Sequence, residues 1–124
     1  MIKFDREDEN VQVYKQLYDG RSNISYKDFF ADASRLPARF QIWTIPPGGS
    51  EGRHSHEHDR LEEIYYVIDG EAMFVTPNGA RPLKTGEAAL ASPGDPHGIR
   101  NVGEKELKLV VLYGTVNGGG KAAD

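Results

Sequence analysis

The sequence predicts an all-β protein, because short apolar segments alternate with turn residues along most of its length. Its 14 glycines and 7 prolines fall mostly between runs that are rich in Val, Ile, Phe, Tyr and Thr. Turn signals at intervals of about ten residues are typical of a β-sandwich or barrel. We therefore expect strands at residues 40–45, 63–68, 72–76, 88–91, 97–101 and 107–115.

The connections between these segments favour antiparallel pairing. Pro77, Asn78 and Gly79 suit a hairpin loop that joins the strand around Phe74 to another around Leu83. The N-terminal region is less regular: residues 11–18 alternate like a further strand, and residues 27–33 fit either one helical turn or a loop. Residues 117–124 contain almost nothing to bury, so we expect a flexible tail.

Length and charge exclude several classes of protein. A chain of 124 residues with 15 Lys+Arg and 19 Asp+Glu has a net charge of -4 and room for one domain. Its basic residues are scattered and do not form the positive patch that is typical of proteins that bind nucleic acid. No apolar run approaches the roughly 20 residues of a membrane span, and acids occupy the N-terminus, so we expect a cytoplasmic protein without a membrane partner. With 0 Cys, any metal ion must be held by His and carboxylate.

A histidine cluster is the strongest chemical signal. Three of the four histidines are His54, His56 and His58, and alternate residues of an extended chain point to the same side. Imidazoles on one face suit a first-row transition metal, and a carboxylate from Glu62 or Glu63 could complete the site. His97 follows a turn-rich segment and could add an imidazole from a distant strand. A solvated polar loop is the alternative interpretation.

A longer pattern around this cluster resembles the first motif of the cupin superfamily of small β-barrels. That motif is commonly written G(X)5HXH(X)3-4E(X)6G. The segment His56-Glu57-His58, with Glu63 and Gly70 following at the required spacings, fits its second half. The opening glycine does not fit, because Ser50 occupies its expected position.

A second pattern resembles the other cupin motif, G(X)5PXG(X)2H(X)3N. Gly86, Gly94, His97 and Asn101 lie at the required spacings, and the single departure is Ser92 in place of proline. The resemblance implies an antiparallel double-stranded β-helix, or jelly-roll barrel, over residues 37–116. It also implies a homodimer, with residues 1–36 packing on the partner or exchanging with it.

The resemblance further implies one divalent transition metal ion per chain, Fe, Mn, Ni, Co or Zn, and turn roles for the motif glycines. The implied ligands are His56, His58, Glu63 and His97, with Asn101 as a structural residue. His54 is then expected at the mouth of the site, as a catalytic or substrate-facing group. A frame with His54 as a ligand needs six residues between the HXH pair and the acid, which is outside the pattern.

Other candidate site residues flank the motifs. Tyr65 is in phase with Glu63 on the expected strand, so it is either a catalytic or substrate-binding group or a core residue with a satisfied hydroxyl. Gln41 and Trp43 share one face of the preceding strand and are candidate substrate-binding residues. Arg53 is another, since guanidinium groups match carboxylate and phosphate, although a solvated surface arginine is the alternative.

The function that the resemblance implies is that of a metal-dependent enzyme acting on a small polar or aromatic metabolite. Dioxygenase-like chemistry is the leading expectation, and isomerase, decarboxylase or cyclase chemistry is the alternative within enzymes. A cupin that binds a small ligand without turning it over is the alternative outside them. Neither the metal nor the substrate follows from the sequence.

Overall fold

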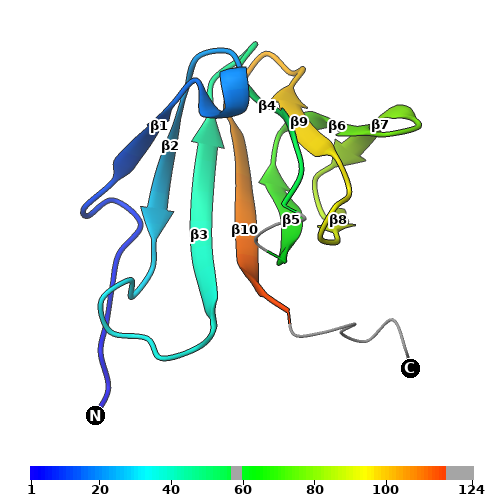
Figure 1. The fold of residues 1–124 in the computed structure, drawn as a ribbon. Helices are drawn as coiled ribbons and strands as arrows, with labels where there is room; N and C mark the ends of the chain where they lie inside the picture. The colour runs from blue at the N-terminus through cyan, green and yellow to red at the C-terminus, as the bar shows by residue number, and fades with distance from the viewer. Residues whose placement is uncertain (57–59, 117–124) are drawn as a thin grey trace.

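The protein consists of two antiparallel β-sheets whose inner faces share one core (Figure 1). The structure is a computed structural model that describes residues 1–56 and 60–116. The strand order in the six-stranded sheet is β1 (Gln12–Lys15), β2 (Asn23–Asp28), β3 (Ala38–Ile45), β10 (Leu107–Thr115), β5 (Leu61–Asp69) and β8 (Ala88–Ala91). The order in the four-stranded sheet is β4 (Ser50–His54), β9 (His97–Asn101), β6 (Glu71–Thr76) and β7 (Gly79–Lys84). The predicted all-β antiparallel fold is therefore confirmed.

Alternation along the strands determines which side chains form the core. On β5, Glu63, Tyr65 and Val67 are buried, whereas Ile64 and Tyr66 are exposed on the outer face. The core combines side chains from both sheets, and its fully buried members include Ile45, Ile99, Leu107 and Leu109. The space between the sheets at one end of this core is where the candidate site lies.

Two strands, β2 and β4, were not predicted from the sequence. β2 begins before the 27–33 segment that was expected to be a helical turn or a loop. Its Lys27 is buried, and Asp5 compensates the charge of the ammonium group at 2.8 Å. β4 contains Glu51 and Gly52, residues that strands seldom favour. The predicted strand at 11–18 is shorter than expected. β1 ends at Lys15, and a 3-10 turn, η1 (Leu17–Asp19), follows it.

Two motif glycines and Asn101 have the structural roles that the two patterns implied. Gly70 and Gly86 have φ values of 110° and 88°, a conformation that side-chain-bearing residues rarely adopt. Asn101 is buried, and its amide group donates to the carbonyl groups of Ile45 and Lys105 at 2.9 Å each. No helix in the described part of the chain is long and apolar enough to cross a membrane. The predicted tail at 117–124 lies outside the described residues.

Candidate metal centre

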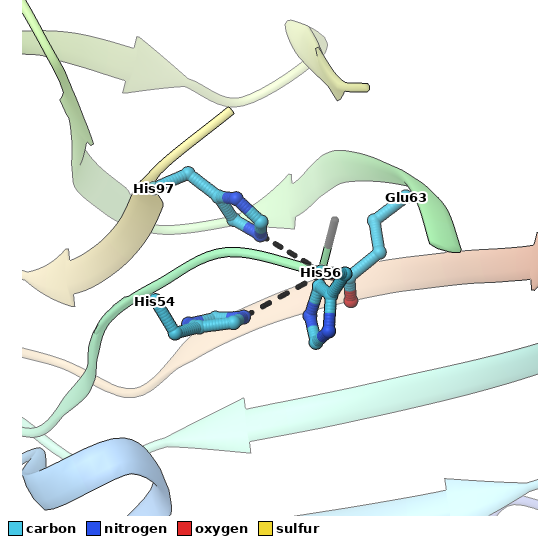
Figure 2. Close-up of side chains that lie close together, drawn as sticks. All are labelled: His54, His56, Glu63 and His97. Carbon is cyan, nitrogen blue, oxygen red and sulfur yellow. Dashed lines mark hydrogen bonds and ion pairs between the residues drawn. The ribbon is translucent and has the colours of Figure 1, made fainter. Parts of the chain in front are cut away.

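Four side chains capable of binding a metal ion converge between the two sheets: His54, His56, Glu63 and His97 (Figure 2). One ligand atom from each lies within 4.8 Å of all the others. His54 ends β4, His56 follows it, Glu63 lies on β5 and His97 begins β9. Three separate segments of the chain therefore supply the cluster.

The carboxylate of Glu63 is the centre of this group. Its Oε1 atom lies 2.9 Å from Nε2 of His97 and 3.0 Å from Nε2 of His56. Nε2 of His54 is 3.7 Å from the same oxygen. All three imidazoles thus present the same ring nitrogen to one oxygen atom.

Backbone carbonyl groups orient two of the imidazoles. Nδ1 of His54 donates to the carbonyl of Gly52, and Nδ1 of His97 donates to the carbonyl of Asp95, each at 2.8 Å. A carbonyl oxygen can only accept, so Nδ1 carries the proton in both rings. In the neutral rings the lone pair of Nε2 therefore points into the cluster, which is the usual arrangement of metal-binding histidines.

An irregularity in β4 explains why His54 points inward. The pairing of β4 with β9 shifts register between Glu51 and His54, and His54 then faces His97 across the two strands. In a regular strand, residues three apart point to opposite faces. Because of the shift, Glu51 and His54 both project into the core, where both side chains are largely buried.

The ionisable groups of the cluster shift one another's pKa values. Burial raises the pKa of Glu63, but the imidazoles of His54 and His97 outweigh this effect and lower that pKa to about 2. Burial lowers the pKa of His97, yet its bonds to Glu63 and to the Asp95 carbonyl produce a net increase. Burial is the main cause of the lowered pKa of His56. An ionised carboxylate therefore lies among imidazoles, one of which readily takes up a proton.

Glu51 is a second buried carboxyl group beside the cluster, and the sequence interpretation missed it. Its Oε2 atom lies 3.4 Å from Nε2 of His54, and its side chain accepts a 2.9 Å hydrogen bond from the hydroxyl of Tyr65. Burial and the nearby charge of Glu63 raise the pKa of Glu51 well above its usual value. In the sequence, the only indication of this role is the position of Glu51 three residues before His54. Acidic residues are common on protein surfaces, so this position alone does not predict a buried carboxyl group.

The donor set fits a divalent transition metal ion. Three imidazoles and one carboxylate match the ligands that such ions prefer. Nε2 of His54 is buried and has no hydrogen-bond partner among the described residues, so its lone pair is available to a cation. The ionised carboxylate of Glu63 also favours a positive ion, because a buried negative charge is stable only when it is paired.

A cavity of about 240 Å³ opens beside the cluster. His56, Glu63 and Glu51 form one part of its wall. Most of the remainder is aromatic, and the contributing rings are those of Tyr14, Tyr18, Trp43 and Tyr113. None of the described residues that line it is Lys or Arg.

The other predicted site residues lie at different distances from this cavity. Trp43 lines it, while Gln41 lies behind and accepts a 2.8 Å hydrogen bond from the Trp43 indole. Tyr65 is fully buried with its hydroxyl bonded to Glu51, which matches the interpretation of a satisfied core residue. Arg53 is exposed and does not line the cavity.

The structure places His54 closer to the other candidate ligands than the motif spacing implied. The sequence interpretation placed His54 at the mouth and made His58 a ligand, whereas His54 is a member of the observed cluster. His58 lies outside the described residues. A signal for His54 was present, since Gly48 precedes it with five residues between them and thus supplies the opening glycine that the other frame lacks. The two extra residues then fall between His56 and Glu63.

Comparison with known proteins identifies the family. Residues 41–113 match the family model described as the cupin domain, so the chain belongs to the cupin family. It is 34% identical over 91 residues to the oxalate-binding protein of Thermotoga maritima, an alignment that covers 73% of this chain and 71% of that protein.

Solved structures agree with this assignment. The crystal structure of a predicted oxalate decarboxylase from Thermotoga maritima superposes with a TM-score of 0.83 at 26% identity, covering 92% of this chain and 100% of that one. A Cupin 2 conserved barrel domain protein from Salinispora arenicola has a TM-score of 0.74 at 18% identity, covering 99% and 92% of the two chains. The second likeness concerns the fold alone.

Proposed function

We propose that this chain is a metal-dependent cupin enzyme that acts on a small planar metabolite through oxygen-dependent, dioxygenase-like chemistry. The observation that carries the proposal is the convergence of three Nε2 atoms and one carboxylate at the wall of a cavity. His54, His56, Glu63 and His97 would hold the metal ion. When bound, a redox-active divalent ion supplies a Lewis acid and a site for dioxygen chemistry.

The protein's own residues would bind and orient the substrate. Trp43 and Tyr113 offer flat apolar walls on which a planar ring can pack. Glu51 borders the same space and can hydrogen-bond to a substrate hydroxyl. Tyr65 would act through Glu51, because its hydroxyl fixes that carboxyl group and does not reach the cavity.

Charge favours a neutral or singly charged substrate. Glu51 and Glu63 are both acidic, and none of the described lining residues is Lys or Arg. A dianion would therefore depend on the metal ion alone for its charge balance. Aromatic or enolic compounds with adjacent oxygen atoms meet these conditions better than a small dicarboxylate does.

The relatives favour a second candidate, the binding or decarboxylation of oxalate or of a similar small acid. One relative is described as an oxalate-binding protein and another as a predicted oxalate decarboxylase. Oxalate has the adjacent oxygen donors that a metal site can accept. The absence of Lys and Arg from the described cavity lining is the feature that opposes it.

Oxygen uptake distinguishes these candidates. Protein stripped by a chelator is reloaded anaerobically with Fe(II), and catechols, enols and oxalate are added separately in air-saturated buffer. We expect oxygen consumption with an aromatic or enolic compound and none with the His56→Ala variant. Turnover with Mn(II) or Zn(II) and no oxygen demand would instead indicate isomerase or decarboxylase chemistry. Tight binding of oxalate without turnover would indicate a binding protein.

We also propose that the chain forms a homodimer through the outer face of the six-stranded sheet. A row of apolar side chains crosses four strands there, because Leu112 pairs with Phe40 and Ile64, and Ile64 pairs with Leu90. These four side chains, with Tyr66 and Ile68, are between 37% and 59% exposed. A continuous apolar patch without charge at its centre suits a second copy of itself, since nothing in it repels its own kind.

The area of this face alone is smaller than that of a standard interface. Four strands about 4.8 Å apart and about seven residues long give a plane of roughly 400 Å², whereas standard interfaces bury about 800 Å² per partner. Met1, Ile2 and Phe4 are strongly exposed and could supply additional area. They precede a segment that is fixed to the same side of the sheet by the ion pairs of Asp5 with Lys27 and of Glu7 with Lys108.

Sedimentation of the wild type and two variants tests this interface. We expect a dimer for the wild type and a monomer for Leu112→Glu, which places a charge at the centre of the row. Val13→Glu adds the same charge on β1, the strand that the sequence interpretation expected to meet the partner, and should remain a dimer. Dissociation of Val13→Glu but not of Leu112→Glu would place the interface on the N-terminal strand. A monomeric wild type at micromolar concentration would refute the dimer.

A further inference from the structure

The turn that follows β1 has an unfavourable backbone conformation. Gln16, Tyr18 and Asp19 have φ values of 47°, 52° and 62°, in the left-handed region that residues with side chains seldom adopt. Such strain persists only where surrounding contacts impose it, and it often occurs at functional sites. The contacts that impose it here come from β4, the strand that carries His54.

Two glycines hold the turn against β4 at backbone distance. A Cβ atom on Gly20 would lie 2.0 Å from the carbonyl oxygen of Ser50, and one on Gly52 would lie 1.7 Å from the carbonyl oxygen of Tyr18. Arg21 and Ser50 add a backbone hydrogen bond of 2.9 Å between the same segments. The turn and the ligand strand therefore form one closely packed unit.

The result of this packing is a ring stack on a metal-ligand candidate. The ring of Tyr18 lies parallel to the imidazole of His54, with centroids 3.7 Å apart and an interplanar angle of 8°. Tyr18 also lines the cavity, and its side chain is 46% exposed. An aromatic residue held in a strained turn with its flat face on His54 requires an explanation beyond core packing.

We propose that Tyr18 is a positioning residue that fixes the plane of the His54 imidazole for metal binding. The carbonyl of Gly52 determines which nitrogen carries the proton, and the Tyr18 ring restricts rotation of the imidazole about its bond to Cβ. Together they keep Nε2 directed at the cluster. This inference rests on the metal site of the proposed function.

Cobalt titrations of ring variants test the role of Tyr18. Stripped protein is titrated with Co(II), and both the affinity and the visible absorption spectrum are recorded. Tyr18→Phe keeps the stack and should bind within about twofold of the wild type with the same spectrum. Tyr18→Ala and Tyr18→Leu remove the flat ring and should bind about 10- to 100-fold more weakly, with shifted absorption bands at saturation.

Val102→Ala is the control. Val102 is exposed to a similar degree, 49%, but it follows β9 and lies outside both the cavity lining and the proposed dimer face, so its truncation should leave Co(II) affinity unchanged. Urea unfolding of the metal-free proteins identifies variants that fail to fold. If Tyr18→Ala fails to fold, Tyr18→Leu can be tested in its place. Equal affinity and an unchanged spectrum in folded Tyr18→Leu would overturn the inference while leaving the metal site intact. Failure of the wild type to bind Co(II) would refute both.

Discussion

The hydroxyl of Tyr65 donates to Oε1 of Glu51 at 2.9 Å. Both residues are buried, since Tyr65 is inaccessible to solvent and Glu51 is only 3% exposed. The same hydroxyl lies 3.4 Å from Oε1 of Glu63. One phenol group therefore connects the carboxyl groups of two strands that belong to different sheets. This arrangement brings a second acidic group to the edge of the cluster.

Glu51 should make the stability of the metal-free protein depend on pH. Its pKa is raised in the folded state, mainly by burial, so the folded protein holds a proton that the unfolded chain loses above about pH 4.5. Folding stability should then decrease as pH rises, by at most about 1.4 kcal/mol per pH unit from this group. Glu51→Gln should remove that part of the slope. Urea unfolding between pH 5 and 8 measures it.

The exposed Glu104 provides the control for this measurement. Glu104→Gln should keep the wild-type slope. His97 also has a raised pKa, so its contribution is present at low pH and is lost as pH rises, in the same direction. The difference between the variants, not the wild-type slope itself, therefore reports on Glu51. A slope in Glu51→Gln equal to that of the wild type would contradict the assignment.

Single histidine substitutions should identify the ligand frame. His54→Ala and His56→Ala each remove one Nε2 atom from the cluster, so both should lose metal on dialysis, with at least about tenfold weaker binding. His58→Ala should retain metal if the ligands are those of the observed cluster. Metal content after dialysis against a weak chelator is the measurement. Retention by His54→Ala together with loss by His58→Ala would restore the frame expected from the motif spacing.

The sequence was sufficient for the parts of the fold that follow regular periodicity. Alternation on β5 predicted that Glu63 and Tyr65 point inward, and both are buried. The second motif predicted His97 as a member of the site and Asn101 as a structural residue. Such placements can be predicted because period-two alternation and turn glycines act locally.

The rest of the site depends on features that alternation does not encode. The register shift in β4 brings Glu51 and His54 to the same side of the strand, and strand patterns from one sequence do not locate such a bulge. The aromatic wall from Tyr14 and Tyr18 is another example, because it depends on η1 lying against β4. If His54 and His56 form the histidine pair, the connection to Glu63 is also two residues longer than the motif spacing allows.

Asn101 should contribute to stability and not to metal binding. Its amide group donates to two carbonyl groups, and its Oδ1 atom accepts from the backbone N–H of Gly103 at 2.9 Å. Asn101→Ala leaves these buried groups without partners, so unfolding free energy should decrease by about 2–3 kcal/mol. Asn78→Ala, at an exposed hairpin position, should change it by less than about 0.5 kcal/mol. Weakened Co(II) binding in folded Asn101→Ala would contradict a purely structural role.

Gly52 should be the least tolerant glycine of the site, because its Cα faces the backbone of the strained turn. Alanine there would place a Cβ atom 1.7 Å from the carbonyl oxygen of Tyr18, and backbone cannot move aside as a flexible side chain does. We expect Gly52→Ala to lower the unfolding free energy by about 2–3 kcal/mol. Gly103→Ala places its Cβ no closer than 3.5 Å to any neighbour and should cost less than about 0.5 kcal/mol.

Metal binding separates two explanations for the effect of Gly52→Ala. If the glycine serves only to let the turn approach, the variant should resemble Tyr18→Ala in Co(II) affinity, because displacement of the turn removes the ring from His54. Since the carbonyl of Gly52 also accepts the Nδ1 proton of His54, any shift of this backbone should weaken binding further. We therefore expect Gly52→Ala to bind Co(II) more weakly than Tyr18→Ala does. Wild-type affinity in a folded Gly52→Ala protein would show that neither the turn nor the carbonyl orients His54.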